Sequence, residues 1–359
     1  MATAAIDEAR LEEFVGRVVT DMSAAISAPL TMLGDKLGLY RAMAGAGPLT
    51  SAEIAEKAEC DERMVREWLA NQVAGGYVEY DADGDRYELP AEHAMVFADP
   101  ESPVYLMGGF DIMASIWADE EKFLRAFKSG EGVGWHEHDH RLFHGTEKFF
   151  RPGYQTHLVA EWIPALDGVE EKLKQGIRVA DVGCGHGAST LIMARAYPNS
   201  EFVGFDYHKE SIGRARELAE EEGLSDRVSF EVGTAQDFPG SYDLVCNFDC
   251  LHDMGDPVGA AKHTAEALNA GGTYFIVEPN GGDSLTDNVH PVGRMFYGAS
   301  TLICTPASQS QEVGLALGAQ AGEARLTEVL NEGGFSSVRR ATETPFNIIL
   351  EARAREEAG

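Results

Sequence analysis

Apolar and polar positions follow two alternating periods along the second half of the chain. Short apolar runs such as 179–182 have the length of buried strands, and segments such as 188–197 then repeat apolar positions at helical spacing. Strand followed by helix, repeated, is typical of an α/β fold with a largely parallel, Rossmann-like sheet. The seven predicted strands are 179–182, 202–206, 228–232, 242–246, 273–277, 337–343 and 346–352.

The first hundred residues have a different pattern. Residues 49–58 and 61–73 each place apolar positions at helical spacing with a brief break between them, which predicts a helix-turn-helix. Residues 75–90 contain two strand-like segments around Asp-Ala-Asp-Gly-Asp, a turn typical of a wing hairpin. Amphipathic helices are predicted over 105–127 and 149–166. The predicted domains are a winged helix over 1–100, a helical linker that caps the substrate pocket over 101–170, and the α/β domain over 171–359.

The turn after the first strand of the α/β domain is the most informative motif. Asp181 stands two residues before the alternating Gly183, Gly185 and Gly187. Glycine takes positive φ and lets a ligand lie against the backbone, while the next helix presents free N–H groups and the positive end of its dipole. A glycine run alone is weak evidence, because dinucleotide-binding enzymes use a related turn and because tight packing without a ligand also needs glycine.

The second strand ends in Asp206, about twenty residues further on. A carboxylate at this place can accept both hydroxyls of a ribose. The alternative interpretation of Asp206 is an N-cap for the helix that follows. A third strand leads into a short polar segment, 233–239, and a fourth into 247–253.

These motifs in this order resemble the class I S-adenosylmethionine-dependent methyltransferases over roughly 172–353. The resemblance implies that Asp181 and the glycines surround the methionine part of S-adenosylmethionine, that Asp206 binds the ribose, and that 234–237 contacts the adenine. Many members have Asp where this chain has Thr234, and Asp237 is the replacement. The implied cofactor-binding residues are Asp181, Gly183, Gly185, Gly187, Asp206, Tyr207, Ala235, Asp237, Asn247 and Phe248.

Further segments extend the resemblance to a family of bacterial and archaeal winged-helix methyltransferases. Small-molecule methyltransferases with such an N-terminal domain use it to build a homodimer and to help close the substrate chamber. The similarity thus implies a small-molecule methyl acceptor and a homodimer, and leaves the acceptor atom open. The matching segments are 132–139, 149–154, 161–167, 249–257, 297–301 and 344–347.

Leu251-His252-Asp253, with Asp256 beyond, resembles the Leu-His-Asp-Trp-x-Asp segment of winged-helix O-methyltransferases. In those enzymes the histidine is the general base and an acid elsewhere orients it, so the resemblance implies His252 and Asp253 as catalytic residues. An imidazole with a pKa of about 6.5 accepts a proton near neutrality. Met254 replaces the usual Trp. The equal alternative is that His252 only forms hydrogen bonds within its loop.

Four histidines lie within nine positions, at 136, 138, 140 and 144. Alternating histidines could hold a metal, but this spacing is typical of no metal class, and nearby glycines favour a loop that faces the substrate. We therefore predict no metal. A long insertion over 283–322 is predicted to form a lid. The predicted substrate-pocket residues are Trp135, His136, His138, Arg294 and Tyr297.

The net charge of −30 comes from 59 acidic against 29 basic residues. Such a surface repels nucleic acid and anionic membranes. The acids are spread over the whole chain, which favours adaptation to a cytoplasm of very high salt over a basic partner. Five cysteines without framework spacing, and the absence of a signal-like or membrane-spanning run, predict a cytoplasmic protein.

Three other functions compete with a small-molecule methyltransferase. A ligand-responsive transcription regulator would use the winged helix on DNA, but Asp61, Glu62 and Glu67 oppose phosphate contact there. A nicotinamide-dependent oxidoreductase is disfavoured by the alternating glycines. A methyltransferase acting on RNA or DNA is disfavoured by the charge.

Overall fold

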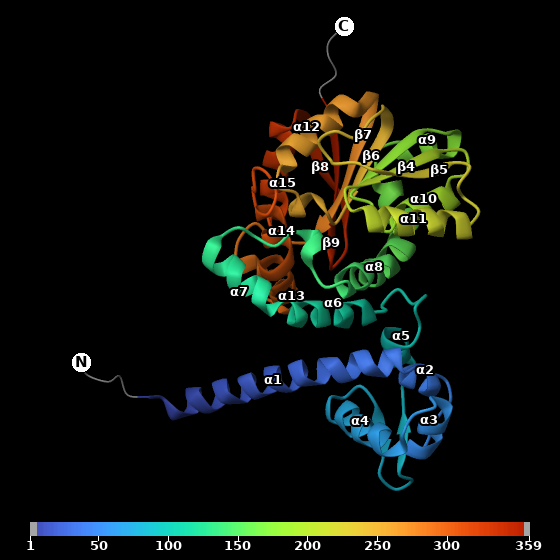
Figure 1. The fold of residues 1–359 in the computed structure, drawn as a ribbon, viewed down its shortest axis with the longest axis vertical. Coiled ribbons are helices and arrows are strands. Elements are labelled where there is room, and N and C mark those ends of the chain that lie inside the picture. The colour runs from blue at the N-terminus through green and yellow to red at the C-terminus, as the bar shows by residue number, and fades with distance from the viewer. Residues whose placement is uncertain (1–5, 355–359) are drawn as a thin grey trace. The chain divides into compact units, whose positions relative to one another are not determined.

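The computed structural model describes residues 6–354, which divide into two compact units (Figure 1). The first unit contains the chain up to Ala114 together with His144–Pro152. The second contains Ser115–Phe143 and the chain from Gly153 onward. The chain passes between the units within two helices, α6 (Met107–Ala118) and α8 (Arg141–Gly153). The segment predicted as a linker is thus shared between both units.

The second unit is built on a seven-stranded sheet in the order β5-β4-β3-β6-β7-β9-β8. Neighbouring strands from β5 to β7 are parallel, whereas β9 is antiparallel to both β7 and β8. The order reverses beside β3, and ligands of open α/β sheets bind where it does so. The strands are β3 (Arg178–Val182), β4 (Glu201–Asp206), β5 (Val228–Val232), β6 (Tyr242–Phe248), β7 (Leu268–Pro279), β8 (Phe335–Glu343) and β9 (Asn347–Ala354).

All seven predicted strands are present, and the α/β fold class is confirmed. The central strands are apolar on both faces because helices cover both: Val179, Ala180 and Val245 are each fully buried. The clearest difference from the sequence prediction is β7. It was predicted over 273–277, but it begins at Leu268 and extends to Pro279, so Glu278 is part of the strand.

Helices flank this sheet in the order in which they connect its strands. In Figure 1, α10 and α11 lie near β4 and β5, and α12 and α15 lie near β7 and β8. The helices are α7 (Glu120–Ser129), α9 (Val169–Gln175), α10 (Ala188–Ala196), α11 (Lys209–Glu221), α12 (Pro257–Ala267), α13 (Pro291–Ala299), α14 (Thr305–Gln309) and α15 (Gly322–Glu332). Short 3-10 turns cover 135–137, 163–165, 251–253 and 286–288, and π-helical turns cover 154–162 and 300–304.

The two predicted linker helices differ from the structure in their detail. The stretch 105–127 is broken at Asp119, where α6 ends and α7 begins. The stretch 149–166 is the end of α8 followed by the π-helical segment 154–162. The predicted lid, 283–322, is largely helical because it contains α13 and α14.

The first unit contains the winged helix. Its core packs Tyr40 against Trp68 and Phe97, with ring centroids 5.0 and 4.9 Å apart. The sequence did not predict its longest helix, α1, because most of the apolar residues of α1 are exposed, although Leu30 near its end packs against the core. The elements are α1 (Glu8–Lys36), α2 (Leu39–Met43), α3 (Ser51–Lys57), α4 (Glu62–Ala74), β1 (Glu79–Asp81), β2 (Arg86–Glu88) and α5 (Ala91–Phe97).

Candidate functional site

The glycine turn lies between β3 and α10, and its three glycines have positive φ angles of 79°, 53° and 79°. A Cβ on Gly183 would lie 2.6 Å from the Cys250 sulfur, and one on Gly187 would lie 2.5 Å from the Phe230 ring. These two glycines are required by packing. A Cβ on Gly185 would meet nothing within 4 Å, so the backbone of Gly185 borders open space.

Asp181 is fully buried at the end of β3. One carboxylate oxygen accepts the hydroxyls of Ser189 and Thr190 at 2.7 and 2.6 Å, which fixes the start of α10 against the strand. The other oxygen, Oδ1, is buried with no hydrogen-bond partner among the described residues. Burial raises the pKa of Asp181 to about 6. Unpaired buried oxygens are rare, so this atom marks a place for a donor.

Asp206 ends β4 and joins that strand to the glycine turn. Its two oxygens accept the backbone N–H groups of Gly185 at 2.9 Å and His208 at 2.8 Å. Burial raises the pKa of Asp206. The N-cap of α11 is His208 rather than Asp206, so the alternative of a helix cap for Asp206 is wrong. Tyr207, the next residue, is 43% exposed.

The third motif forms a short loop after β5. The exposed Asp237 accepts the backbone N–H and the hydroxyl of Thr234 at 3.1 and 2.7 Å, and these bonds lower its pKa. Ala235 lies partly buried between them. Asp237 therefore shapes the loop that was expected to contact adenine.

The side chains at the end of β6 are used within the sheet. The Asn247 amide donates to the Val182 carbonyl at 2.5 Å and accepts the Tyr274 hydroxyl. Phe248 is buried and packs edge-on against Phe275 at a centroid distance of 5.2 Å. Both residues hold β6 beside the glycine turn.

His252 is 4% exposed and lies between two carboxylates. Its Nδ1 is 2.5 Å from Glu278, and its Nε2 is 3.2 Å from Oδ1 of Asp253. Burial alone would lower the pKa of the imidazole, but the charges of Asp253 and Glu278 raise it well above its usual value. Both ring nitrogens therefore lie near carboxylates, which favour the charged form of the imidazole.

Sequence reasoning missed several groups around His252. Glu278 also accepts the Leu251 N–H at 2.9 Å, and its signal was an acid directly after an apolar strand. Asp249, with a φ of 51°, accepts the Tyr154 hydroxyl at 2.8 Å and the Asn347 amide at 2.7 Å. Burial raises the pKa of Asp249 to about 7.

Cys304 was also missed, because nothing in the sequence links it to His252. Its thiol hydrogen-bonds the imidazole, and burial raises the pKa of the thiol to about 12. His252, Asp253 and Cys304 bring metal-ligand atoms within 4.8 Å of one another, but the imidazole nitrogens already face Glu278 and Asp253.

The histidine-rich segment does not act as one group. His138 is 6% exposed, whereas His136 and His140 are exposed. Trp135 packs on Phe143 at a centroid distance of 5.6 Å, and Phe143 stacks on His208 at 4.7 Å. The segment thus packs against the end of β4.

The other predicted pocket residues lie on α13. Arg294 is exposed, and the Tyr297 hydroxyl is 3.4 Å from the Asn288 amide that donates to it. Their role in a substrate pocket stays a prediction.

Family comparisons divide the chain in the same way as its fold. Residues 173–334 match the family model described as a methyltransferase domain, and residues 24–98 match the model of an Rv2258c-like winged HTH domain. The chain joins a winged helix-turn-helix domain to a methyltransferase domain. The family resemblance drawn from the sequence motifs is confirmed.

Individual relatives show the same domain. Ajmaline N-methyltransferase of Rauvolfia serpentina is 32% identical over 123 residues, 33% of this chain and 42% of the relative. The chain thus spans less than half the length of the curated relatives it matches. The solved structure of mitomycin 7-O-methyltransferase has a TM-score of 0.67 at 21% identity, covering 97% of this chain and 99% of that one. Human N-acetylserotonin methyltransferase, solved with S-adenosylmethionine, has a TM-score of 0.68 at 16% identity, covering 99% of each chain.

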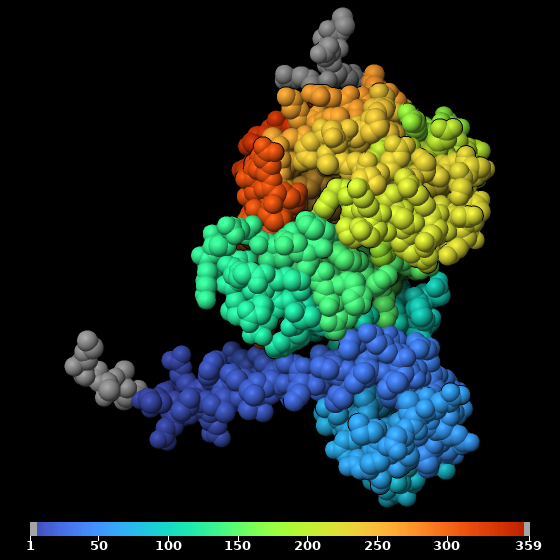
Figure 2. All heavy atoms as spheres, viewed as in Figure 1, coloured from blue at the N-terminus to red at the C-terminus, as the bar shows by residue number. Residues whose placement is uncertain are grey.

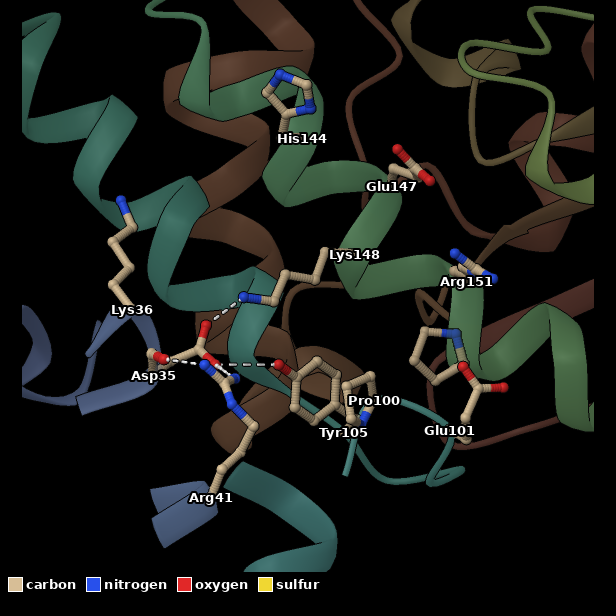
Figure 3. A pocket seen from close by; sticks show the side chains of 11 residues that line it. Asp35, Lys36, Arg41, Pro100, Glu101, Tyr105, His144, Glu147, Lys148 and Arg151 are labelled. Carbon is tan, nitrogen blue, oxygen red and sulfur yellow. Dashed lines mark hydrogen bonds and ion pairs between the residues drawn. The ribbon is translucent and has the colours of Figure 1, made fainter. Parts of the chain in front are cut away.

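A separate cavity of about 410 Å³ lies within the first unit (Figure 3). Asp35 stands on its wall and pairs with Arg41 at 3.1 Å and Lys148 at 2.5 Å, while the Tyr105 hydroxyl donates to it at 3.3 Å. These pairings compensate the charge of Asp35 within the protein. The cavity therefore has the character of a structural ion-pair network rather than of the methyltransferase site.

The buried carboxyl of Asp181 predicts a pH-dependent stability. Its ordinary pKa is 3.8 and its folded pKa about 6, so the folded state binds this proton more tightly and stability falls as pH rises from about 4 to about 6. In Asp181→Asn the amide oxygen still accepts both hydroxyls and no charge is buried. We expect the variant to be more stable than the wild type at pH 8, by up to about 3 kcal/mol, and to gain nothing at pH 4. Thermal melts at both pH values measure this, and an equal difference at both would contradict the shifted pKa.

Proposed function

We propose that the protein transfers a methyl group from S-adenosylmethionine to a small molecule. The observation that carries this proposal is the meeting of Asp181, Gly185 and Asp206 at one edge of the sheet. They come from the ends of two neighbouring parallel strands, and Asp206 is hydrogen-bonded directly to the Gly185 backbone. The methyltransferase family of residues 173–334 supports the same cofactor.

The residues present fit S-adenosylmethionine, which supplies a methyl group on a positively charged sulfur. The open space over Gly185 admits the methionine part, and the unpaired Oδ1 of Asp181 suits a donor such as its ammonium group. Each Asp206 oxygen accepts one backbone N–H and retains a lone pair for a ribose hydroxyl. The half-exposed Tyr207 ring lies next to this carboxylate.

The adenine is assigned to the loop after β5. Ala235 offers an apolar surface, and Asp237 has one oxygen without a hydrogen bond to Thr234. Asn247 and Phe248 serve the cofactor indirectly, because their side chains hold β6 against the glycine turn.

The acceptor is proposed to be a small molecule because the charges disfavour a nucleic acid. On α4, the arginines pair with acids of the same helix: Arg63 with Glu67 at 2.5 Å and Arg66 with Glu62 at 3.3 Å. Their charge is thus already compensated. The matched relatives named for ajmaline and mitomycin act on small molecules, one on nitrogen and one on oxygen, so the acceptor atom is left open.

Methyl transfer is tested with purified protein and S-adenosylmethionine labelled in the methyl group. Three separate reactions receive a small-molecule extract, total RNA or total protein from a halophilic prokaryote. We expect label in the small-molecule fraction, and its mass spectrum identifies the acceptor. Label only in RNA or protein would contradict the acceptor class. No transfer despite tight binding of S-adenosylhomocysteine would favour the transcription regulator.

We also propose that α1 pairs two copies of the chain as a homodimer. Figure 2 shows the first half of α1, in dark blue, uncovered on the face in view. Its exposed apolar side chains recur at helical spacing and form one stripe. A contiguous exposed apolar stripe of this kind marks an interaction surface, and an identical helix supplies a matching apolar face. The stripe consists of Leu11, Phe14, Val15, Val18, Val19, Met22 and Ile26.

A charge placed on this stripe separates the copies. We expect the wild type to sediment with the mass of two chains and Val18→Glu with the mass of one, because burying a carboxylate without a partner is costly. Thr20→Glu adds the same charge on the opposite face of the helix and is the matched control. A monomeric wild type, or equal masses for both variants, would contradict the pairing.

The acidity is proposed to be an adaptation to a cytoplasm of high salt. All five cysteines are free in the structure, which fits a reducing compartment, and no helix among the described residues is long and apolar enough to cross a membrane. Salt screens repulsion between exposed acids. We expect the melting temperature to rise strongly from dilute buffer to molar KCl, and an unchanged melting temperature would contradict this origin of the charge.

A further inference from the structure

A histidine and an aspartate form a buried pair apart from the His252 cluster. Nδ1 of His138 lies 2.9 Å from Oδ2 of Asp119, and the two side chains are 1% and 2% exposed. Asp119 stands between α6 and α7, and His138 follows the 3-10 turn 135–137. The two residues are nineteen positions apart, so only the folded chain brings them together.

Asp119 is held as a carboxylate. Lys122 donates to its Oδ1 at 2.6 Å, and the Asp139 backbone N–H donates to its Oδ2 at 3.0 Å. Burial acts to raise the pKa of Asp119, but these donors lower it below its usual value. A carboxylate can only accept hydrogen bonds, so the proton of the neutral imidazole must be on Nδ1.

Nε2 of His138 is therefore the nitrogen with a lone pair. It is buried and has no hydrogen-bond partner among the described residues. Burial lowers the pKa of His138 below its usual value, and the bond to Asp119 offsets only part of this effect. The ring is thus neutral near pH 7, with an acceptor atom that no protein group uses.

The surroundings place His138 at the cofactor edge of the sheet. His208 stands two residues after Asp206 at the end of β4, and α14, which contains Pro306, is held beside the His252 loop because the Ser308 hydroxyl donates to the Met254 carbonyl at 2.7 Å. The segment around His138 is fixed there, because Phe143 stacks on His208 and the Val133 N–H donates to Pro306 at 3.0 Å.

Unlike His138, His252 has no ring nitrogen that lies away from a carboxylate. Both of its nitrogens lie near carboxylates, whose charges favour the imidazolium form, and an imidazolium has no lone pair to offer to an acceptor. Its contacts suit a positioning residue that fixes Asp253 and Glu278. A protonated imidazole cannot remove a proton.

We propose that His138 is the general base of the methyl transfer, with Asp119 as its positioning partner. This inference rests on the proposed function. The acceptor O–H or N–H gives its proton to Nε2 of His138. The electron pair left on the acceptor forms a bond to the methyl carbon, and the bond from that carbon to sulfur breaks with its electrons on sulfur. The charge that His138 gains is balanced by the Asp119 carboxylate.

Histidine NMR tests the ground state without any acceptor. In protein labelled with ¹⁵N and saturated with S-adenosylhomocysteine, we expect His138 to be neutral at pH 7 with the proton on Nδ1, and His252 to be protonated. His138→Asn identifies the signals. A protonated His138 at pH 7, or a proton on Nε2, would overturn the proposal even if methyl transfer occurs.

Label transfer to the small-molecule extract tests the chemical step. His138→Asn retains a side-chain N–H that can donate to Asp119 but has no basic nitrogen. We expect a loss of about 100-fold or more in rate at pH 7, a residual rate that rises with pH, and unchanged affinity for S-adenosylhomocysteine. His140→Asn alters an exposed histidine of the same segment and should leave the rate unchanged.

Each result has a distinct meaning. A wild type that labels no fraction contradicts the proposed function itself. A wild type that transfers label while His138→Asn keeps its rate and pH profile contradicts only the role of His138. Parallel loss of rate and of S-adenosylhomocysteine affinity would show that His138 has a structural role instead.

Discussion

Carboxylates buried at one edge of a parallel sheet impose the constraint on which the rest of the site depends. Asp181, Asp206 and Glu278 belong to the carboxyl-terminal ends of β3, β4 and β7, and each needs donors because an unpaired carboxylate in the interior is costly. Asp206 meets this need with the Gly185 N–H, which fixes the glycine turn to the neighbouring strand. Asp181 uses two hydroxyls of α10 on one oxygen and leaves the other open. The same constraint that shapes the turn therefore creates the place where a positively charged ligand fits.

Two histidines near this edge of the sheet, His252 and His138, have opposite electrostatic surroundings. His252 lies between Glu278 and Asp253; burial acts to lower its pKa, but the charges of these two acids raise it well above its usual value. His138 has a single acidic partner, Asp119, which is itself neutralised by Lys122, so burial keeps its ring uncharged. The difference arises from the number of uncompensated carboxylates around each ring. On the proposal made above, this difference makes His138 the proton acceptor in place of His252, the residue that motif similarity suggests.

Local sequence patterns predicted the elements but not the contacts between distant residues. The glycines, Asp206 and the wing were recognisable because each depends on a few adjacent residues with a defined backbone requirement. Glu278 was missed because the apolar run suggested that its strand ends at Val277, and the pairing with β9 extends β7 to Pro279. The pair of His138 with Asp119 has no local pattern, since it joins a helix junction to a loop. Helix α1 was missed because its apolar stripe is exposed and adds no contact to the core of its own unit.

The central claim is that the open space over Gly185 receives S-adenosylmethionine, and calorimetry with S-adenosylhomocysteine tests it most directly. Gly185→Ala places a methyl group in that space, while Gly223→Ala imposes the same kind of strain, with a φ of 67° and no neighbour within 4 Å, away from the turn. We expect the wild type and Gly223→Ala to bind S-adenosylhomocysteine equally, Gly185→Ala to bind it at least about 10-fold more weakly, which is about 1.4 kcal/mol, and none of them to bind NAD. Equal binding by all three proteins, or binding of NAD in place of S-adenosylhomocysteine, would contradict it.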